Sequence, residues 1–236
     1  MENVVEIHSR LNDKLVLKVT PGHFSSDRFH VNYYIDMSSL KTRQSDAKMV
    51  AEVMASQYVK KVKVENDKLS HFANVSALAE LTANKKPIDT IICMDGCEVI
   101  GAYLVDELMK GGFPCNTKHK SFYVIAPEFD NTGQMVVRNN VKNMIKGRNV
   151  LVVLASAMSG HTITKAIGTI LAYGGKVTGL SVIFANVDKV DGYPVYGVFT
   201  HEDLPNFKLS LPDECEYCKA GKKLTAVVNS YGYESL

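Results

Sequence analysis

The run "SGHT" follows a continuous apolar segment in the second half of the chain and combines hydroxyl, glycine and histidine residues. Ser159, Gly160, His161 and Thr162 stand at the start of a predicted helix, with Met158 before them. The first amide N–H groups of a helix have no partners within it, and its dipole favours an anion at that end. We therefore predict that this turn binds a phosphate group. The alternative is that Ser159 only caps the helix.

Common signatures of phosphate binding and hydrolysis do not account for this turn. It lacks the Gly-Lys-Ser/Thr ending of a P-loop and the Gly-x-Gly-x-x-Gly spacing of a dinucleotide-binding loop. It also lacks the Gly-x-Ser-x-Gly sequence of a serine hydrolase. "LASAMSGHT" contains no acidic residue and no lysine, so the turn predicts binding of a phosphate without predicting a reaction.

A second polar turn follows the apolar run "IDTIICM" and consists of Asp95, Gly96, Cys97 and Glu98. Ligands of parallel sheets bind beyond the carboxyl ends of the strands, so we predict that this turn faces the same ligand. The alternative is structural, with an aspartate in a turn and a glutamate that complements the dipole of the next helix.

Patterns of apolar residues predict the elements that position these turns. Alternation in "KLVLKV" and "HVNYYIDMS" indicates antiparallel strands near the start of the chain. The predicted helices cover residues 45–62, 71–86, 99–112 and 161–175, and the predicted strands cover 88–94, 121–126, 149–155 and 176–185. Continuous apolar strands alternating with helices predict an α/β fold, in which helices cover both faces of a parallel sheet.

Composition and charge exclude several classes of protein. Of 236 residues, 46% are hydrophobic and 22% are charged, as in an ordinary globular protein. A net charge of +2 gives no field that would attract nucleic acid or an anionic membrane, and the basic stretches at 59–64 and 218–223 are short. The amino terminus is charged, and the five cysteines are an odd number. We therefore expect a cytoplasmic protein with reduced thiols.

Several motifs together resemble the type I phosphoribosyltransferases, in particular the orotate phosphoribosyltransferase branch. "VLVVLASAMSGHT" is similar to the motif with which that family binds phosphoribosyl pyrophosphate. "GHF" at 22–24 and "HVNYYID" at 30–36 resemble the amino-terminal hood of the family. "DTIICMDGCEVIGAYLV" resembles its second substrate loop, and "ECEYCKAGKKL" resembles its carboxyl-terminal tail. The resemblance implies the type I phosphoribosyltransferase fold and a homodimer.

The same resemblance implies three parts of the chain. Residues 1–65 are expected to form a small hood of strands with a helix, and residues 66–210 the phosphoribosyltransferase-like α/β core. Residues 211–236 are expected to form a tail that packs near the hood.

The departures from the family pattern bear on catalysis. In the family, two acids of the motif bind the ribose hydroxyls, and here Leu154 and Ala155 occupy their positions. The family also has a mobile loop whose Arg, Lys and His residues hold pyrophosphate, whereas "SFYVIAPEFDNTGQMVV" contains none of these. Phosphoribosyl transfer depends on stabilising the positive charge that develops on the ribose and the negative charge that develops on the pyrophosphate. We therefore expect a protein of nucleotide metabolism, or of its regulation, that binds a 5′-phosphate and has weak or no transferase activity. Mg²⁺ is expected only if phosphoribosyl pyrophosphate binds.

Three alternatives remain open. An active transferase would use Asp95 and Glu98 as substitute acids, with Asp130, Arg138 or Lys142 supplied by the loop or a partner subunit. His161 would contact the ligand or only face solvent, and Tyr33 and Tyr34 would stack on a base or belong to the core. The third alternative is a zinc protein using Cys215 and Cys218. Zinc needs four ligands, and the nearest upstream candidates are His201, Glu202 and Asp203, so we expect no metal site.

Overall fold

The structure is a computed structural model that describes residues 3–58 and 87–236. The predicted helix 71–86 and the basic stretch 59–64 lie outside these residues. The predicted helix 45–62 is confirmed over its described part as α2 (Gln44–Tyr58).

A parallel sheet forms the centre of the molecule, as predicted. Its strands follow the order β10-β11-β9-β8-β4-β5, and every neighbouring pair is parallel except β10 and β11. The strands are β4 (Thr90–Cys93), β5 (Tyr123–Ile125), β8 (Asn149–Ala157), β9 (Lys176–Ala185), β10 (Lys189–Val190) and β11 (Tyr193–Thr200). The four strands predicted for this region correspond to β4, β5, β8 and β9, whereas β10 and β11 had not been predicted.

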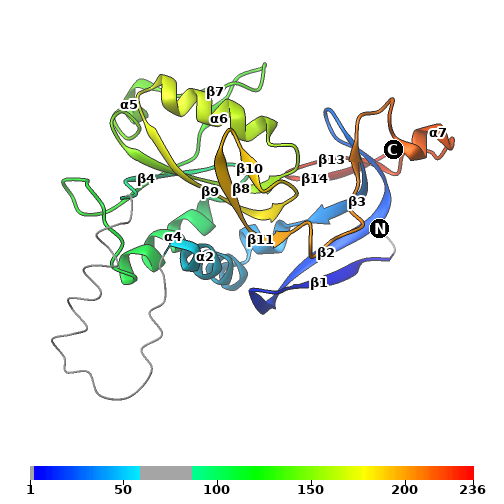
Figure 1. Ribbon diagram of the computed structural model, residues 1–236, viewed down its shortest axis with the longest axis horizontal. Helices are drawn as coiled ribbons and strands as arrows, with labels where there is room; N and C mark the ends of the chain where they lie inside the picture. Colours follow the sequence, from blue (N-terminus) through cyan, green and yellow to red (C-terminus); the bar gives the residue numbers. More distant parts are fainter. Residues whose placement is uncertain (1–2, 59–86) are drawn as a thin grey trace, which may run out of the picture.

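Helices cover both faces of this sheet, which confirms the predicted α/β class. One layer contains α2 and α4 (Glu98–Lys110), and the other contains the short α5 (Asn139–Lys142) and α6 (His161–Ala172). Figure 1 shows α5 and α6 above the sheet and α2 and α4 below it. Along β8, Val153 packs toward α2 and α4 and Leu154 toward α6. Both sides of the strand are buried, which explains its continuous apolar sequence.

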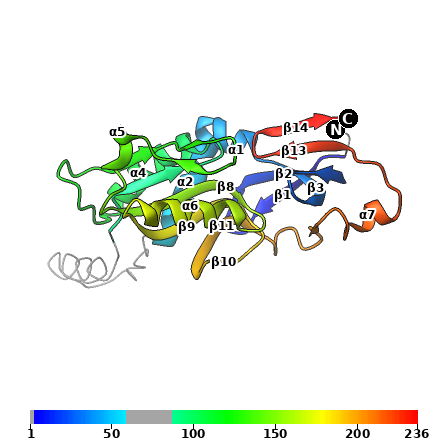
Figure 2. The same ribbon diagram turned by 90° about the horizontal axis from the view of Figure 1, so that it is seen from above.

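A second, antiparallel-rich sheet of six strands forms the hood. Its order is β12-β3-β2-β13-β14, and β1 also pairs with β2. The strands are β1 (Val5–Ser9), β2 (Asn12–Ser25), β3 (His30–Asp36), β12 (Leu209–Ser210), β13 (Ala226–Asn229) and β14 (Gly232–Ser235). Figure 2 shows β13 and β14 running beside β2, with α7 (Glu216–Lys219) at the outer end. The tail thus supplies strands to the hood sheet.

Two shorter features lie outside these two sheets. A two-stranded ladder of β6 (Glu128–Phe129) and β7 (Met135–Val136) follows β5, and the helix α1 (Ser38–Thr42) follows β3. The helix α2 belongs to the predicted 1–65 range, yet it packs on the core sheet through Val50 and Met54. Among the residues that the structure describes, no helix has both the length and the apolar character needed to cross a membrane.

Candidate functional site

The amino terminus of α6 is open, as a phosphate-binding turn requires. Gly160 is the N-cap residue, and no side chain forms a capping hydrogen bond there. Its φ of 81° lies in the left-handed region, and a Cβ atom would approach Cγ2 of Val190 to 2.7 Å. Glycine is therefore required twice, for its conformation and for space. The alternative in which Ser159 caps the helix does not hold.

A cavity of about 610 Å³ lies in front of this helix end, and all five predicted phosphate-binding residues line it. The hydroxyl residues Ser159 and Thr162 are exposed, while Met158 and His161 are half-buried. The ring nitrogen Nε2 of His161 is buried without a hydrogen-bond partner. Such a group is uncommon in folded proteins, and it is satisfied when a ligand donates to it or accepts from it.

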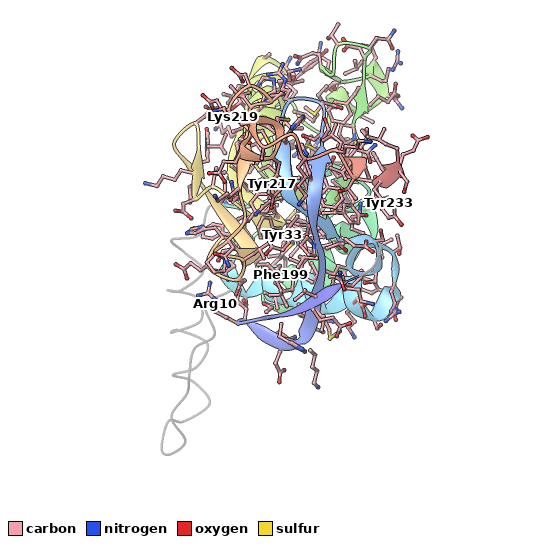
Figure 3. The ribbon with its side chains drawn as sticks, turned by 90° about the vertical axis from the view of Figure 1, so that its right-hand side faces the viewer. Arg10, Tyr33, Phe199, Tyr217, Lys219 and Tyr233 are labelled. Carbon is pink, nitrogen blue, oxygen red and sulfur yellow. The ribbon has the colours of Figure 1, made fainter. Side chains whose placement is uncertain are left out.

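Four segments distant in the sequence form much of the rest of the cavity wall. They are the turn between β2 and β3 (26–29), the strand β3, the tip of the β6–β7 ladder (131–133) and the turn between β13 and β14 (228–231). Tyr33 and Tyr34, whose role the sequence left open, both line the cavity. Tyr34 is also a core residue, because it is 8% exposed and packs edge-on against Tyr233. Tyr33 is half-buried, and it is labelled with Tyr233 in Figure 3.

Leu154 and Ala155, which the sequence resemblance aligns with the family's acids, do not reach the cavity. Leu154 is 1% exposed and packs with the α6 layer, and Ala155 is 0% exposed and packs with the α2–α4 layer. The next residue of β8, Ser156, lines the cavity instead. The side chains of Leu154 and Ala155 offer no acceptor for a ribose hydroxyl. Of the two β8 residues on the cavity wall, Ser156 and Ala157, only Ser156 has a polar side chain, which is a hydroxyl.

Of the predicted second loop, only Asp95 reaches the cavity. Cys97 is buried in the core beside α4, and Glu98 is exposed in the first turn of that helix. Burial raises the pKa of the Asp95 carboxyl, while a hydrogen bond from Ser230 and the charge of Lys41 oppose this rise. The cavity wall therefore holds an acid that burial makes easier to protonate.

Lys41 supports two segments of the cavity wall, and the sequence did not indicate this role. It is 5% exposed, and its Nζ donates hydrogen bonds to the backbone oxygens of Asp95 at 2.9 Å and Ser230 at 2.6 Å. It joins the second loop to the turn of the tail and lies 5.5 Å from the ring centre of Tyr231. Its place in a five-residue helix carried no signal, because both of its partners come from elsewhere in the chain.

The other candidate acids and cations of the active-transferase alternative have structural partners. Arg138 pairs with Glu128 at 2.6 Å, and Asp130 accepts hydrogen bonds from the backbone of the ladder turn. Lys142 lies over the ring of Tyr173 at 5.8 Å. The cations on the cavity wall are instead Arg28 and Lys165, which no sequence motif indicates.

The upstream metal-ligand candidates do not lie near the cysteine pair. Glu202 and Asp203 pair with Arg10, and His201 faces Asp188. Figure 3 shows Arg10 well away from Tyr217, which lies between the two cysteines in the sequence.

Two histidines of the hood, His23 and His30, contact Cys215 and Cys218 instead. The sequence could not join them to the cysteines, because about 190 residues separate the two pairs.

Comparisons with known proteins give structural likeness only. The sequence matches no protein-family model and no curated protein. Orotate phosphoribosyltransferase of Mycobacterium tuberculosis in complex with inorganic phosphate is 13% identical, with a TM-score of 0.45 over 74% of this chain and 81% of that one. A phosphoribosyltransferase from Corynebacterium diphtheriae is 13% identical, with a TM-score of 0.44 over 78% and 91%.

The UMP synthase of Leishmania donovani is 17% identical, with a TM-score of 0.47 over 86% of this chain and 36% of that one. The solved structures that resemble this chain thus include orotate and other phosphoribosyltransferases. Because these three TM-scores are below 0.5, the ligand and activity of this chain rest on its own residues.

Proposed function

We propose that this chain binds a small molecule with one 5′-phosphate, such as a nucleoside monophosphate, and has weak or no phosphoribosyltransferase activity. The observation that carries the proposal is the uncapped amino terminus of α6, which opens on the cavity while the positions of the family's acids are buried. Such a protein would act in nucleotide metabolism or in its regulation.

The phosphate is expected to accept hydrogen bonds from the first amides of α6 and from the hydroxyls of Ser159 and Thr162. Helix amino termini bind anions in this way because their N–H groups and the dipole point at the ligand. Arg28 and Lys165 add positive charge to the wall, and Lys165 Nζ is held by the backbone oxygen of Thr132 at 3.2 Å.

The size and lining of the cavity suit a nucleotide. A volume of about 610 Å³ falls in the range of small-molecule sites. Aromatic residues also line the cavity, namely Phe29, Tyr33, Phe129 and Tyr231. Their rings offer faces on which a base stacks, while the phosphate occupies the helix end.

Weak or absent transfer follows from what the cavity lacks for charge stabilisation. Transfer develops positive charge on ribose and negative charge on pyrophosphate. The strand β8 provides no acid for the ribose, and residues 121–137 contain no Lys, Arg or His for the pyrophosphate. A single phosphate needs neither group.

Titration calorimetry of the full chain with uridine 5′-monophosphate, uridine and ribose 5-phosphate tests the binding proposal. We expect the monophosphate to bind about tenfold or more tightly than uridine, because the charged hydrogen bonds to the phosphate are lost with uridine. Thr162→Val is expected to weaken monophosphate binding about fivefold, as for one lost hydrogen bond. Thr164→Val, an exposed change in the same helix, is the matched control. Equal binding of uridine and its monophosphate would contradict the proposal.

A second candidate function, active transfer, is favoured by one observation, which is the position of Asp95 on the cavity wall. A pyrophosphate-release assay with orotate, phosphoribosyl pyrophosphate and Mg²⁺ separates the two. We expect little or no release above the rate without protein. Release that disappears in Asp95→Asn would establish the second candidate.

A further inference from the structure

Two histidine rings and two thiols of the hood and tail lie around one point. We call this group the Cys/His cluster; its members are His23, His30, Cys215 and Cys218. One ligand atom of each residue lies within 4.8 Å of all the others. The first three residues are buried and Cys218 is exposed. We infer that the Cys/His cluster binds a zinc ion, which ties the β2–β3 turn of the hood to the tail.

Four of the six distances between the ligand atoms are close to the edges of a zinc tetrahedron, and the other two, which join the sulfur of Cys215 to Cys218 and to His30, are at most 4.8 Å. With ordinary zinc bond lengths, such edges are about 3.3 Å between nitrogens and about 3.6 Å between nitrogen and sulfur. Here His23 Nε2 lies 3.0 Å from His30 Nδ1 and 3.5 Å and 3.6 Å from the sulfurs of Cys215 and Cys218. His30 Nδ1 lies 3.2 Å from the sulfur of Cys218. Two thiolates and two imidazoles are a common ligand set of structural zinc.

Groups around the cluster prepare its ligands. His23 Nδ1 lies 2.9 Å from the backbone oxygen of Lys222. Since a carbonyl oxygen only accepts, Nδ1 carries the proton and Nε2 offers its lone pair to the cluster. Histidines that bind metals are usually oriented by such a bond. The backbone amides of Tyr217 and Cys218 donate hydrogen bonds to the sulfur of Cys215.

A hydrogen bond between the two rings is the metal-free explanation of the histidine pair. It accounts for the 3.0 Å distance between His23 Nε2 and His30 Nδ1, but not for two thiols directed at the same nitrogens. The cluster also lies between two segments that a zinc ion would link, the tail and the β2–β3 turn of the hood. Cys215 is the N-cap residue of the short helix α7 and Cys218 lies within it, while the two histidines flank the turn that lines the cavity.

Metal analysis of the full chain, with any histidine tag removed, tests the inference. The protein is purified with a reductant from zinc-containing medium, and zinc is measured by mass spectrometry. We expect about one zinc ion per chain. Exchange of zinc for Co²⁺ is expected to give the visible bands of a tetrahedral site and a near-ultraviolet thiolate-to-cobalt band. Absence of zinc together with absence of these bands would overturn the inference, whatever the variants do.

Variants then assign the ligands. Cys218→Ser changes one atom of an exposed residue and is expected to lower the zinc content by at least about half. The cobalt thiolate band should become weaker, because one of the two thiolate ligands is removed. Cys115→Ser and His119→Ala change a cysteine and a histidine outside the cluster. Both variants are expected to keep the zinc content and the cobalt thiolate band of the wild type. Zinc retained in Cys218→Ser with an unchanged cobalt spectrum would also overturn the inference. No nucleotide is present in these measurements, so their outcome does not depend on the proposed function.

Discussion

Lys41 Nζ donates a hydrogen bond of 2.6 Å to the backbone oxygen of Ser230, and this bond joins the first helix to the turn of the tail. The same ammonium group reaches the backbone oxygen of Asp95 at 2.9 Å. Three segments of the cavity region therefore meet at one buried cation. Its position predicts that the tail is held over the cavity by Lys41 as well as by strand pairing.

Replacement of Lys41 by methionine is expected to destabilise the protein by about 2 kcal/mol or more, because two buried carbonyl oxygens lose their donor. Urea unfolding of both proteins measures the change. Lys110→Met removes an exposed ion pair with Glu107 and is expected to change stability by less than about 0.5 kcal/mol. Equal effects of the two substitutions would show that Lys41 has no special role.

Alanine at Gly160 is expected to destabilise the chain by at least about 1 kcal/mol and to weaken binding of uridine 5′-monophosphate, owing to the strained φ. The contact of 2.7 Å with Val190 adds to the cost. Gly168, two turns later in α6, has no atom within 4 Å of a built Cβ. Gly168→Ala is therefore expected to stabilise the protein by about 0.5–1 kcal/mol, as alanine does in an exposed helix. Thermal unfolding and calorimetry of the two variants make the comparison within one helix.

Restoring the family's acids is expected to damage the fold. A carboxylate at Leu154 or Ala155 would be buried in an apolar layer, and we expect each substitution by aspartate to cost at least about 3 kcal/mol. Ser156→Asp places the same charge on the cavity wall instead, where we expect the fold to persist and the affinity for uridine 5′-monophosphate to fall by repulsion. Ser156→Asn is the uncharged control. Urea unfolding checks the first expectation and calorimetry the second. Stable folding of the Leu154→Asp variant would contradict the burial argument.

The pKa of Asp95 predicts a change of stability with pH. Burial raises this pKa above its ordinary value of 3.8, so the folded chain keeps a proton that the unfolded chain has lost. The contribution of Asp95 is therefore largest below pH 3.8 and declines as the pH rises to the folded pKa. Asp95→Asn is expected to lack this decline, so its stability relative to the wild type should rise with pH over that window.

Asp130 provides a control of opposite sign. Its hydrogen bond with the Thr132 hydroxyl lowers its pKa, so it stabilises the fold above its ordinary pKa and less as the pH falls. Asp130→Asn should lose stability relative to the wild type as the pH rises. Urea unfolding of the three proteins from about pH 2 to pH 7 measures these differences, because the Asp130 change falls below pH 3.8 and the Asp95 change above it. Parallel profiles for both variants would contradict the assignment to Asp95.

The parts of the structure that could be predicted depend on local sequence. The apolar run of β8, the turn at Gly160 and the helix α6 follow each other directly, so their periodicity and turn chemistry predict the phosphate end of the cavity. The predicted parallel sheet follows from the same local patterns.

The missed features depend on partners that are far apart. Lys41 meets Ser230 across 189 positions, and His30 meets Cys218 across 188. No periodicity connects such residues, since a strand of the tail must first pair with β2. Asp95 and Glu98 are a related case, because they belong to one predicted loop but only Asp95 turns toward the cavity.

Zinc bound at the Cys/His cluster should protect the tail from proteolysis, and removal of the metal should end this protection. Lys219, Lys222 and Lys223 are exposed and lie directly after the Cys/His cluster. Without the ion, Cys215 and Cys218 lose their link to the hood, so the segment around α7 should open more often and expose these sites to trypsin. We expect chelation of zinc to accelerate cleavage at these lysines, as identified by mass spectrometry of the fragments. Cleavage after Lys18, in β2, should change less, because Lys18 is paired on both sides, with Glu6 of β1 and with Asp36 of β3. Re-addition of Zn²⁺ should restore protection in the wild type but not in Cys218→Ser, and protection that survives chelation would show that strand pairing alone orders the tail.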